Sequence, residues 1–214
     1  MSSKVEPLPK KLVGSVLALT LLVLGLGAAV VVLKLKPAEL PTTAIERNVE
    51  SWRRETIANP NSDEARVGLG LALLEARKED EARAVFEDAL ELNPRNWNAL
   101  LQLGVLTSED LPEKALGLLA RSAKNAPPGS IAVPFIAQGD LLMRLNRYEE
   151  AASAFRSANA DVPYLFDGHF GLAQALEQLG DRRGALLEYR EAARFDPTNQ
   201  DVAAAIDRLT NQDG

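Results

Sequence analysis

The sequence predicts an all-α protein, a right-handed α-solenoid of four helix pairs with capping helices, preceded by a single transmembrane helix. Two observations support this fold class. A residue pattern returns about every 34 positions across residues 62–197, and an uncharged apolar run fills residues 12–33. A repeat period of about 20 to 50 residues is typical of solenoids, and an apolar run of about 20 residues is typical of membrane spans.

The N-terminal segment is predicted to anchor the chain in a membrane. Residues 1–11 form a short basic tail, and the run from Leu12 to Leu33 contains no charged side chain. At about 1.5 Å per residue this helix is roughly 33 Å long, enough to cross a bilayer. A cleaved signal peptide has a core of only about 7 to 15 residues, so we expect an uncleaved anchor.

The basic residues that flank the apolar run predict its orientation. Lys4, Lys10 and Lys11 precede it, whereas Lys34 and Lys36 follow it. Because basic flanks stay on the cytoplasmic side, three against two favours a cytoplasmic N-terminus. We therefore expect a single-pass protein of the cell (inner) membrane, with its helical repeats on the extracytoplasmic side.

Residues 34–61 are predicted to form a juxtamembrane linker and an N-terminal capping helix. From Thr42 to Ala58 apolar and small residues recur at helical spacing, and Asn59-Pro60 ends the helix. The residues expected on one face are Ile45, Val49, Trp52 and Thr56. This segment has the pattern of half a repeat, with Trp52 as its aromatic residue.

Four copies of the repeat pattern occupy residues 62–197. Each copy has small residues flanking a large one, followed by a proline. The copies are Ala82, Phe86, Ala89 and Pro94; Ala115, Leu119, Ser122 and Pro127; Ala151, Phe155, Ala158 and Pro163; and Ala185, Tyr189, Ala192 and Pro197. Small residues let two helices approach, the large residue fills the gap between them, and proline separates one helix from the next.

Two copies depart from the average spacing. Pro94 and Pro127 lie closer together than the repeat period, and the missing residue is expected near Ser108 to Pro112. Pro127 and Pro163 lie further apart than the period, which predicts a longer loop at residues 127–130. Both changes fall in turns, where insertions and deletions cost little.

Residues 198–214 are predicted to form a C-terminal capping helix and tail. Val202, Ala205, Ile206 and Leu209 recur at helical spacing, and such a helix would cover the last repeat. Thr198 and Asp201 have the spacing of a capping box, which predicts that Thr198 caps this helix.

The repeats resemble those of the tetratricopeptide repeat family, whose repeat unit is a pair of antiparallel helices with the same period. Leu69-Gly70, Ala82, Phe86, Ala89 and Pro94 match its pattern in the first copy. The resemblance implies a concave face that binds a peptide or helix, lined by positions 2, 5, 9, 12 and 13 of each first helix. Those positions are here Glu64, Val67, Leu71, Leu74, Glu75, Asn98, Leu101, Val105, Ser108, Glu109, Val133, Ile136, Asp140, Met143, Arg144, Asp167, Phe170, Gln174, Glu177 and Gln178.

This face is apolar in its first three repeats and carries several carboxylates, so the expected partner has apolar and basic residues. Leu71, Leu101, Val105 and Ile136 are expected to be exposed to receive it. The alternative is that the face folds partly onto itself or onto the helix before the first repeat.

Composition argues against other classes of function. Residues 42–214 carry 19 basic and 28 acidic side chains, a net charge of −9 that disfavours nucleic acid. The chain has no cysteine, and its one histidine, His169, is expected to be a partly buried structural residue. We expect no enzyme activity, cofactor, metal or small-molecule substrate.

The sequence therefore predicts a membrane-anchored scaffold for protein binding. Its layout is similar to that of bacterial factors for cytochrome c maturation and of other envelope assembly factors. The main alternative is a permanent structural subunit of a membrane complex, with its groove filled by a neighbouring subunit. An organellar import receptor has a compatible topology but is disfavoured by the composition.

Overall fold

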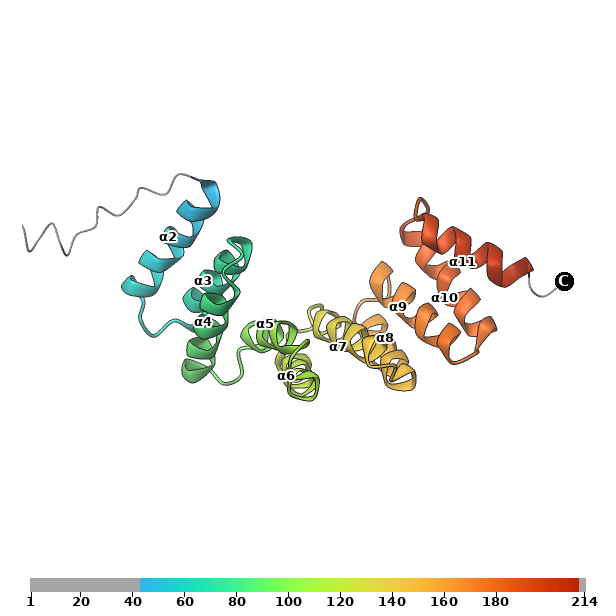
Figure 1. Cartoon of the computed structure of the whole chain (residues 1–214), viewed down its shortest axis with the longest axis horizontal. Helices are drawn as coiled ribbons and strands as arrows, with labels where there is room; N and C mark the ends of the chain where they lie inside the picture. The colour runs from blue at the N-terminus through green and yellow to red at the C-terminus, as the bar shows by residue number, and fades with distance from the viewer. Residues whose placement is uncertain (1–42, 212–214) are drawn as a thin grey trace, which may run out of the picture. The chain divides into compact units, whose positions relative to one another are not determined.

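The computed structural model describes residues 43–211, so the predicted tail and anchor at 1–33 lie outside the described residues. Ten helices follow one another within this range (Figure 1). They are α2 (Ala44–Ala58), α3 (Asp63–Glu75), α4 (Glu79–Leu92), α5 (Trp97–Thr107), α6 (Pro112–Asn125), α7 (Ala132–Arg144), α8 (Tyr148–Asp161), α9 (Phe166–Gln178), α10 (Arg182–Phe195) and α11 (Gln200–Asn211). None of the helices within 43–211 is both long and apolar enough to cross a membrane.

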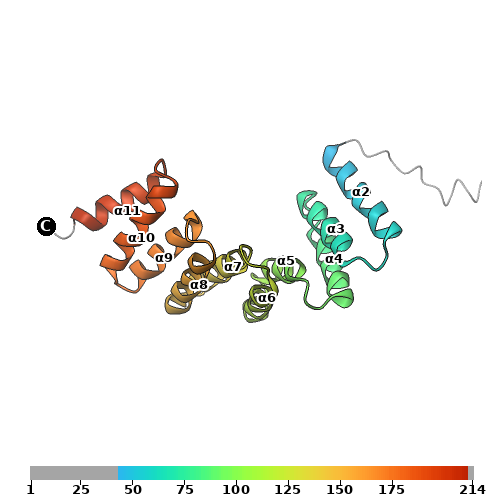
Figure 2. The same ribbon diagram turned by 180° about the vertical axis from the view of Figure 1, so that it is seen from behind.

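The helices α3 to α10 form four antiparallel pairs, α3 with α4, α5 with α6, α7 with α8 and α9 with α10. Each pair also packs on the next, and α11 packs on α10, as views from opposite sides show (Figures 1 and 2). The predicted all-α array of four pairs with one further helix at each end is thus confirmed.

The large residue of each second helix is the centre of its pair. Phe86, Leu119, Phe155 and Tyr189 are all at most 3% exposed. Glycines opposite Phe86, Leu119 and Phe155 allow close contact, since a Cβ on Gly70 would lie 2.4 Å from the Phe86 ring. The predicted burial of the aromatic residues is confirmed, and fully burying such a side chain stabilises the fold by about 1.5–3 kcal/mol.

The two departures in spacing fall in the predicted turns. α5 has 11 residues and ends at Thr107, whereas α3, α7 and α9 each have 13. Pro112 is then the first residue of α6, where its missing N–H and fixed φ suit a helix start. The longer loop lies between the end of α6 and Ala132, as predicted.

α2 covers the first pair mainly through the middle of its predicted face. Val49 is buried and Trp52 is half-buried against α3, whereas Ile45 is 38% exposed. Ile45 is the second residue of α2 and lies at the open end of the helix. Two polar contacts supplement the apolar ones, from Asn48 to Glu75 at 3.2 Å and from Arg53 to Glu81 at 2.8 Å.

α11 covers the last pair through Val202, Ala205 and Leu209, all buried as predicted. The predicted capping box is wrong. Asn199 caps α11 instead, because its Oδ1 accepts a hydrogen bond from the backbone N–H of Val202 at 3.1 Å. Thr198 donates its hydroxyl to Asp196 at 2.7 Å and so belongs to the turn before the helix.

Candidate functional site: the face of the first helices

The first helices α3, α5, α7 and α9 together form the surface on which the sequence-predicted groove residues lie. We call this surface the A-helix face. The exposed predicted residues are Glu64, Leu71, Glu75, Val105, Glu109, Val133, Asp140, Arg144, Asp167, Gln174 and Gln178. The half-buried ones are Leu74, Asn98, Ser108, Ile136, Met143, Phe170 and Glu177.

Two predicted groove residues are buried instead. Val67 is 7% exposed and Leu101 is 6% exposed, so the expectation that Leu101 is free to meet a partner is wrong. Val67 belongs to a hydrophobic cluster that includes Val49, and Leu101 to one that includes Leu141 of the next pair. The fifth residue of α3 and of α5 therefore belongs to the core, whereas Ile136 and Phe170, the fifth residues of α7 and α9, are half-buried.

Three apolar side chains remain exposed on the A-helix face. Leu71, Val105 and Val133 are 39%, 49% and 47% exposed, and they come from three successive first helices. Leu71 and Val105 both occupy the ninth position of their helix. Val133 is the second residue of α7, and Asp140 holds the ninth position there. The exposed apolar side chains thus form separate patches that a partner can cover.

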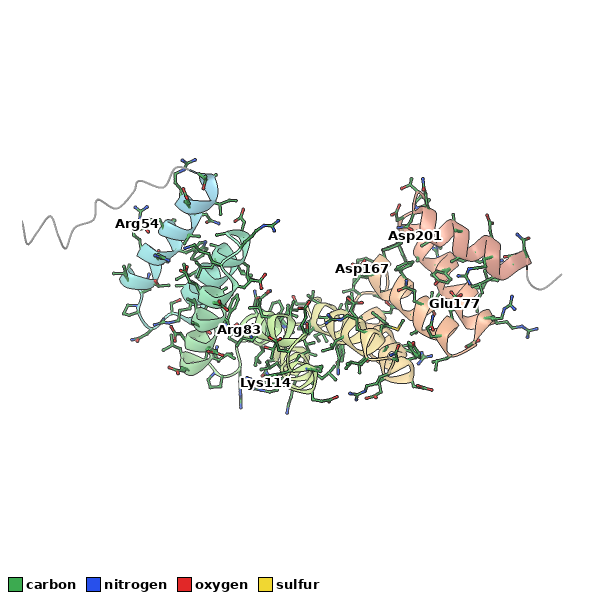
Figure 3. All side chains as sticks on the ribbon, in the orientation of Figure 1. Arg54, Arg83, Lys114, Asp167, Glu177 and Asp201 are labelled. Atoms are coloured by element: carbon green, nitrogen blue, oxygen red, sulfur yellow. The ribbon has the colours of Figure 1, made fainter. Side chains whose placement is uncertain are left out.

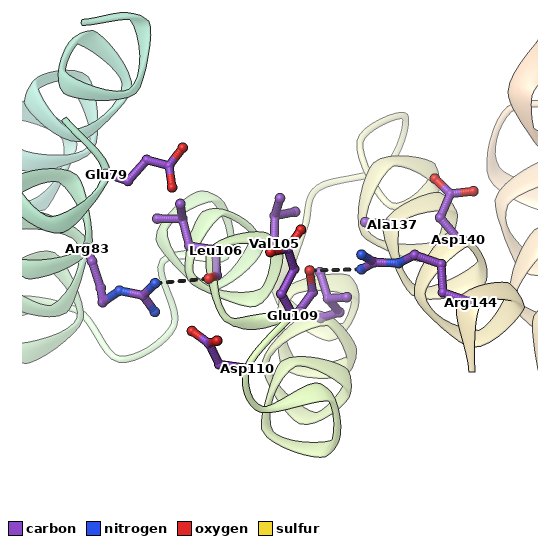
Figure 4. A pocket seen from close by; sticks show the side chains of 11 residues that line it. Glu79, Arg83, Val105, Leu106, Glu109, Asp110, Ala137, Asp140 and Arg144 are labelled. Carbon is purple, nitrogen blue, oxygen red and sulfur yellow. Dashed lines mark hydrogen bonds between the residues drawn. The ribbon is translucent and has the colours of Figure 1, made fainter. Parts of the chain in front are cut away.

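A cleft of about 570 Å³ opens at the middle of this face. Its lining combines predicted groove residues with side chains of α4, α6 and the turn after α5 (Figure 4). The lining residues are Glu79, Arg83, Val105, Leu106, Ser108, Glu109, Asp110, Leu119, Ala137, Asp140 and Arg144. Sequence reasoning missed the α4 contribution, because the family's groove positions all lie on first helices.

The two arginines of the cleft are held by neutral acceptors. Arg83, which lies where α4 meets α5 (Figure 3), donates to the carbonyl oxygen of Leu106 at 3.0 Å. Arg144 donates to the hydroxyl of Ser108 at 2.9 Å (Figure 4). Within the described residues, neither guanidinium forms an ion pair with a carboxylate of the cleft. The cleft's four acidic and two basic side chains leave it with a net negative charge.

Asp140 lies near a second carboxylate, that of Asp167. Partial burial raises the pKa of its carboxyl group, the nearby carboxylate of Asp167 raises it further, and Arg144 opposes both. A group whose charged form is disfavoured in this way gains from a neighbouring cation. The cleft therefore suits a lysine or arginine side chain of a partner.

In α3 and α9 the sixth residue is a glycine that faces an aromatic ring of the preceding helix. A Cβ on Gly171 would lie 2.4 Å from the ring of Phe155, so a small residue is needed for that contact. The sixth residue of α5 is Gln102, and α5 packs less extensively on α4 than α9 does on α8.

His169 has a structural environment, as predicted. Its Nδ1 lies 2.7 Å from a Glu188 carboxylate oxygen, and its Nε2 lies 3.0 Å from the carbonyl oxygen of Pro163. The imidazole also stacks on Phe195, with ring centroids 5.7 Å apart. These contacts tie the turn before α9 to α10. Residues 43–211 contain no group of three or more potential metal ligands around this histidine or elsewhere.

Paired helices whose first members share an open, partly apolar face define a helical-repeat binding protein. A tetratricopeptide repeat profile matches residues 49–96, 67–130 and 136–200. The chain belongs to the tetratricopeptide repeat family, whose domains bind protein or peptide partners and are typically not enzymes.

Two curated relatives share parts of this sequence. A TPR repeat-containing protein of Treponema pallidum is 35% identical over 122 residues, which cover 54% of this chain and 14% of that protein. Anaphase-promoting complex subunit 3 of Schizosaccharomyces pombe is 25% identical over 152 residues, which cover 71% of this chain and 23% of that protein. The chain therefore spans less than a quarter of either relative.

Solved structures of bacterial repeat proteins share the fold. The Pseudomonas aeruginosa PilF structure superposes with a TM-score of 0.69 at 18% identity, covering 77% of this chain and 76% of PilF. PilW, described as a type IV pilus biogenesis factor, gives 0.67 at 13% identity, covering 78% and 82%. YrrB, described as having an unusual peptide-binding site, gives 0.65 at 16% identity, covering 77% and 84%. Identities this low establish the fold alone.

Proposed function

We propose that this protein is a membrane-anchored scaffold that captures a peptide or helix of a partner protein on the A-helix face. The observation that carries the proposal is the exposure of Leu71, Val105 and Val133 on the same face as the carboxylates Glu75, Glu109 and Asp140. The exposed apolar side chains support binding of an apolar stripe, and the carboxylates support recognition of flanking basic residues.

The anchor in this proposal is the uncharged run from Leu12 to Leu33, with the N-terminus in the cytoplasm and the repeats outside it. Protease added to intact spheroplasts is then expected to remove the repeats and to leave a short anchored stub. Full protection of the repeats would mean that the orientation is the opposite one.

The biological role that we propose is assembly or maturation of a membrane or envelope complex, for example in cytochrome c maturation. The support is the layout of one N-terminal anchor followed by a short repeat domain. A permanent structural subunit has the same layout, but its A-helix face would be covered at all times by a neighbouring subunit.

Salt separates these two roles. A captured partner held partly by Glu75, Glu109 and Asp140 is released more readily as salt rises, because exposed charges are screened beyond about 10 Å at about 0.1 M salt. A permanent subunit stays in its complex at fixed stoichiometry through salt and mild detergent, since large apolar interfaces are not screened. A salt titration of the protein purified from native membranes therefore decides between the two roles.

A further inference from the structure

The outer surface of α10 carries a line of basic residues around one exposed leucine. Arg183, Leu187, Arg190 and Arg194 are all exposed, and Leu187 is 62% exposed. Their spacing of four, three and four residues places them along one side of the helix. We call these four residues the α10 stripe.

The acidic residues of α10 pair with only one of the three arginines of the stripe, Arg194. Glu188 lies 2.7 Å from the imidazole of His169 and is held away from solvent, with its side chain 26% exposed. Glu191 accepts a hydrogen bond from Arg194 at 2.7 Å. Arg183 and Arg190 have no carboxylate within ion-pair distance among the described residues. The stripe is thus a positive surface with an apolar centre on a domain of negative net charge.

We infer that the α10 stripe of one copy docks on the A-helix face of a second copy of this chain. The inference rests on the proposed function, because it uses the same binding face. The two surfaces are complementary in charge, with the stripe arginines facing carboxylates such as Glu109 and Asp140. They are also complementary in apolar character, since Leu187 meets the exposed side chain of Val105.

The length of the stripe suits a contact centred on α5. The stripe runs from Arg183 to Arg194, and at about 1.5 Å per residue it extends about 16 Å along the helix. Val105 and Glu109 lie about one turn apart on α5, so a helix surface of this length can contact both of them.

The contact joins different surfaces of the two copies. α10 is fixed between α9 and α11, so its stripe does not reach the A-helix face of its own chain. The copy that uses its stripe keeps its A-helix face free, and the other copy keeps its stripe free. Further copies can therefore add at both ends, which gives rings or open chains. An external partner that occupies the A-helix face would compete with this assembly.

A rival acceptor for the stripe is the outer side of α4, which carries Asp80, Glu87 and Asp88. It matches the stripe in charge, but the exposed residue at its centre is Ala84, which offers Leu187 a single methyl group, and its exposed leucine, Leu92, lies at the end of the helix. The A-helix face offers Val105 at 49% exposure and is therefore favoured. Ala84 then provides a matched control position.

Disulfide trapping tests the inference on the full-length chain, which has no cysteine of its own. Full-length V105C and L187C chains with different tags are mixed and oxidised. A disulfide requires the two Cβ atoms to come within about 4.5 Å, so we expect mixed V105C–L187C dimers well above the same-variant dimers. An equal yield of L187C with A84C, or no excess of the mixed dimer, overturns the inference.

Charge reversal provides a second readout. R190E on the L187C chain is expected to lower the yield of mixed dimer about tenfold, a typical effect of placing like charges across an interface. E109R on the V105C chain is expected to restore it. No loss with R190E, or no recovery with E109R, contradicts docking of the stripe on this face.

The same variants separate this inference from the proposed function. R190E leaves the A-helix face intact, so capture of an external partner persists even where copies no longer dock. If no mixed dimer forms while substitutions of Val105 still abolish partner capture, docking between copies is wrong and the proposed function stands. If the mixed dimer forms but substitutions of Val105 leave partner capture unchanged, the external partner binds elsewhere.

Discussion

The indole ring of Trp52 in α2 lies so close to Gly68 in α3 that a Cβ on this glycine would sit 2.5 Å from the ring carbons. Phe155 in α8 contacts Gly171 in α9 in the same way, at 2.4 Å. Both glycines are the sixth residue of their helices. Trp52 therefore contacts α3 as the aromatic residue of a second helix contacts the next pair, although α2 packs on α3 less extensively than α8 does on α9.

The close contact at Gly171 predicts that replacing this glycine by alanine destabilises the protein. Phe155 is 1% exposed and is also contacted by Gly139, so its ring has no room to move away from an added methyl group. We expect Gly171→Ala to lower the free energy of unfolding, because overpacking a core costs about 1–3 kcal/mol. Denaturant unfolding followed by circular dichroism measures the change.

Gly117 in α6 is the matched control, because a Cβ there would meet nothing within 4 Å. Gly117→Ala is expected to stabilise the protein by about 1 kcal/mol through helix propensity alone. If Gly171→Ala stabilises the protein as much as Gly117→Ala does, the described contact between α8 and α9 is wrong.

Phe86 is expected to contribute strongly to stability. It is 0% exposed and packs against Gly70, so Phe86→Ala leaves a cavity between α3 and α4. The expected loss is about 3–5 kcal/mol, measured by denaturant unfolding. Phe195 is 38% exposed, and Phe195→Ala is expected to cost far less. A loss below about 1 kcal/mol for Phe86→Ala would contradict the repeat register.

Asp63 makes the stability of the first helix pair depend on pH. Burial raises the pKa of this carboxyl group, but hydrogen bonds from Asn96 at 2.8 Å and Asn93 at 2.7 Å lower it more, so the net shift is downward. A carboxylate with a lowered pKa in the folded state adds stability above its unfolded pKa. That stability is lost as the pH falls through the folded pKa.

We therefore expect Asp63→Asn to cost about 1 kcal/mol at neutral pH, the usual net value of a hydrogen bond. The difference from the unsubstituted protein should close as the pH falls below about 4, where carboxylates become protonated. Denaturant unfolding at a series of pH values measures it. A difference that is unchanged between neutral and acidic pH would show that the charge of Asp63 is not involved.

Replacing two neighbouring apolar residues of α5 by glutamine is expected to change the stability of the fold by very different amounts. Leu101 is buried, and Leu101→Gln should destabilise the fold by about 2–5 kcal/mol, the usual cost of removing a large apolar side chain from a core. Val105 is 49% exposed, and Val105→Gln should change stability by less than about 0.5 kcal/mol. Thermal unfolding of both variants checks this, and equal losses would mean that Val105 is part of the core.

Much of the fold could be predicted from the sequence, because each helix pair is specified locally. The prolines after each second helix fix the repeat length, and the small residues around Phe86 and Tyr189 fix which faces meet. The correct placement of both irregular turns follows from the same reasoning, since Pro112 begins a helix and the Pro127 loop interrupts the period. The anchor at 12–33 stays a prediction.

The candidate site was less predictable, because exposure depends on how neighbouring pairs pack. Val67 and Leu101 hold positions that line the groove in the family, yet here they are covered by adjacent helices. Arg83 was missed because its place in the cleft depends on the spacing between α4 and α5. Nothing in the repeat pattern of the second helices marks Arg83 as a cleft residue.

The residue that caps α11 could not be predicted from the sequence pattern either. Thr198 matched a capping pattern, but Asn199 lies one residue nearer the helix and caps it. Both side chains can accept a hydrogen bond from a helix N-terminus, so the choice between them depends on where the turn after α10 places the first residue of α11.

The most direct test of binding on the A-helix face compares photo-crosslinking from two exposed positions of the full-length protein in native membranes. One crosslinker replaces Val105 on the A-helix face, and the other replaces Ala84 on the outer side of α4. We expect one partner polypeptide to crosslink from position 105 in a saturable manner, to weaken with added salt, and to be absent at position 84. Equal crosslinking of the same polypeptide from both positions, or from position 84 alone, would contradict binding on the A-helix face.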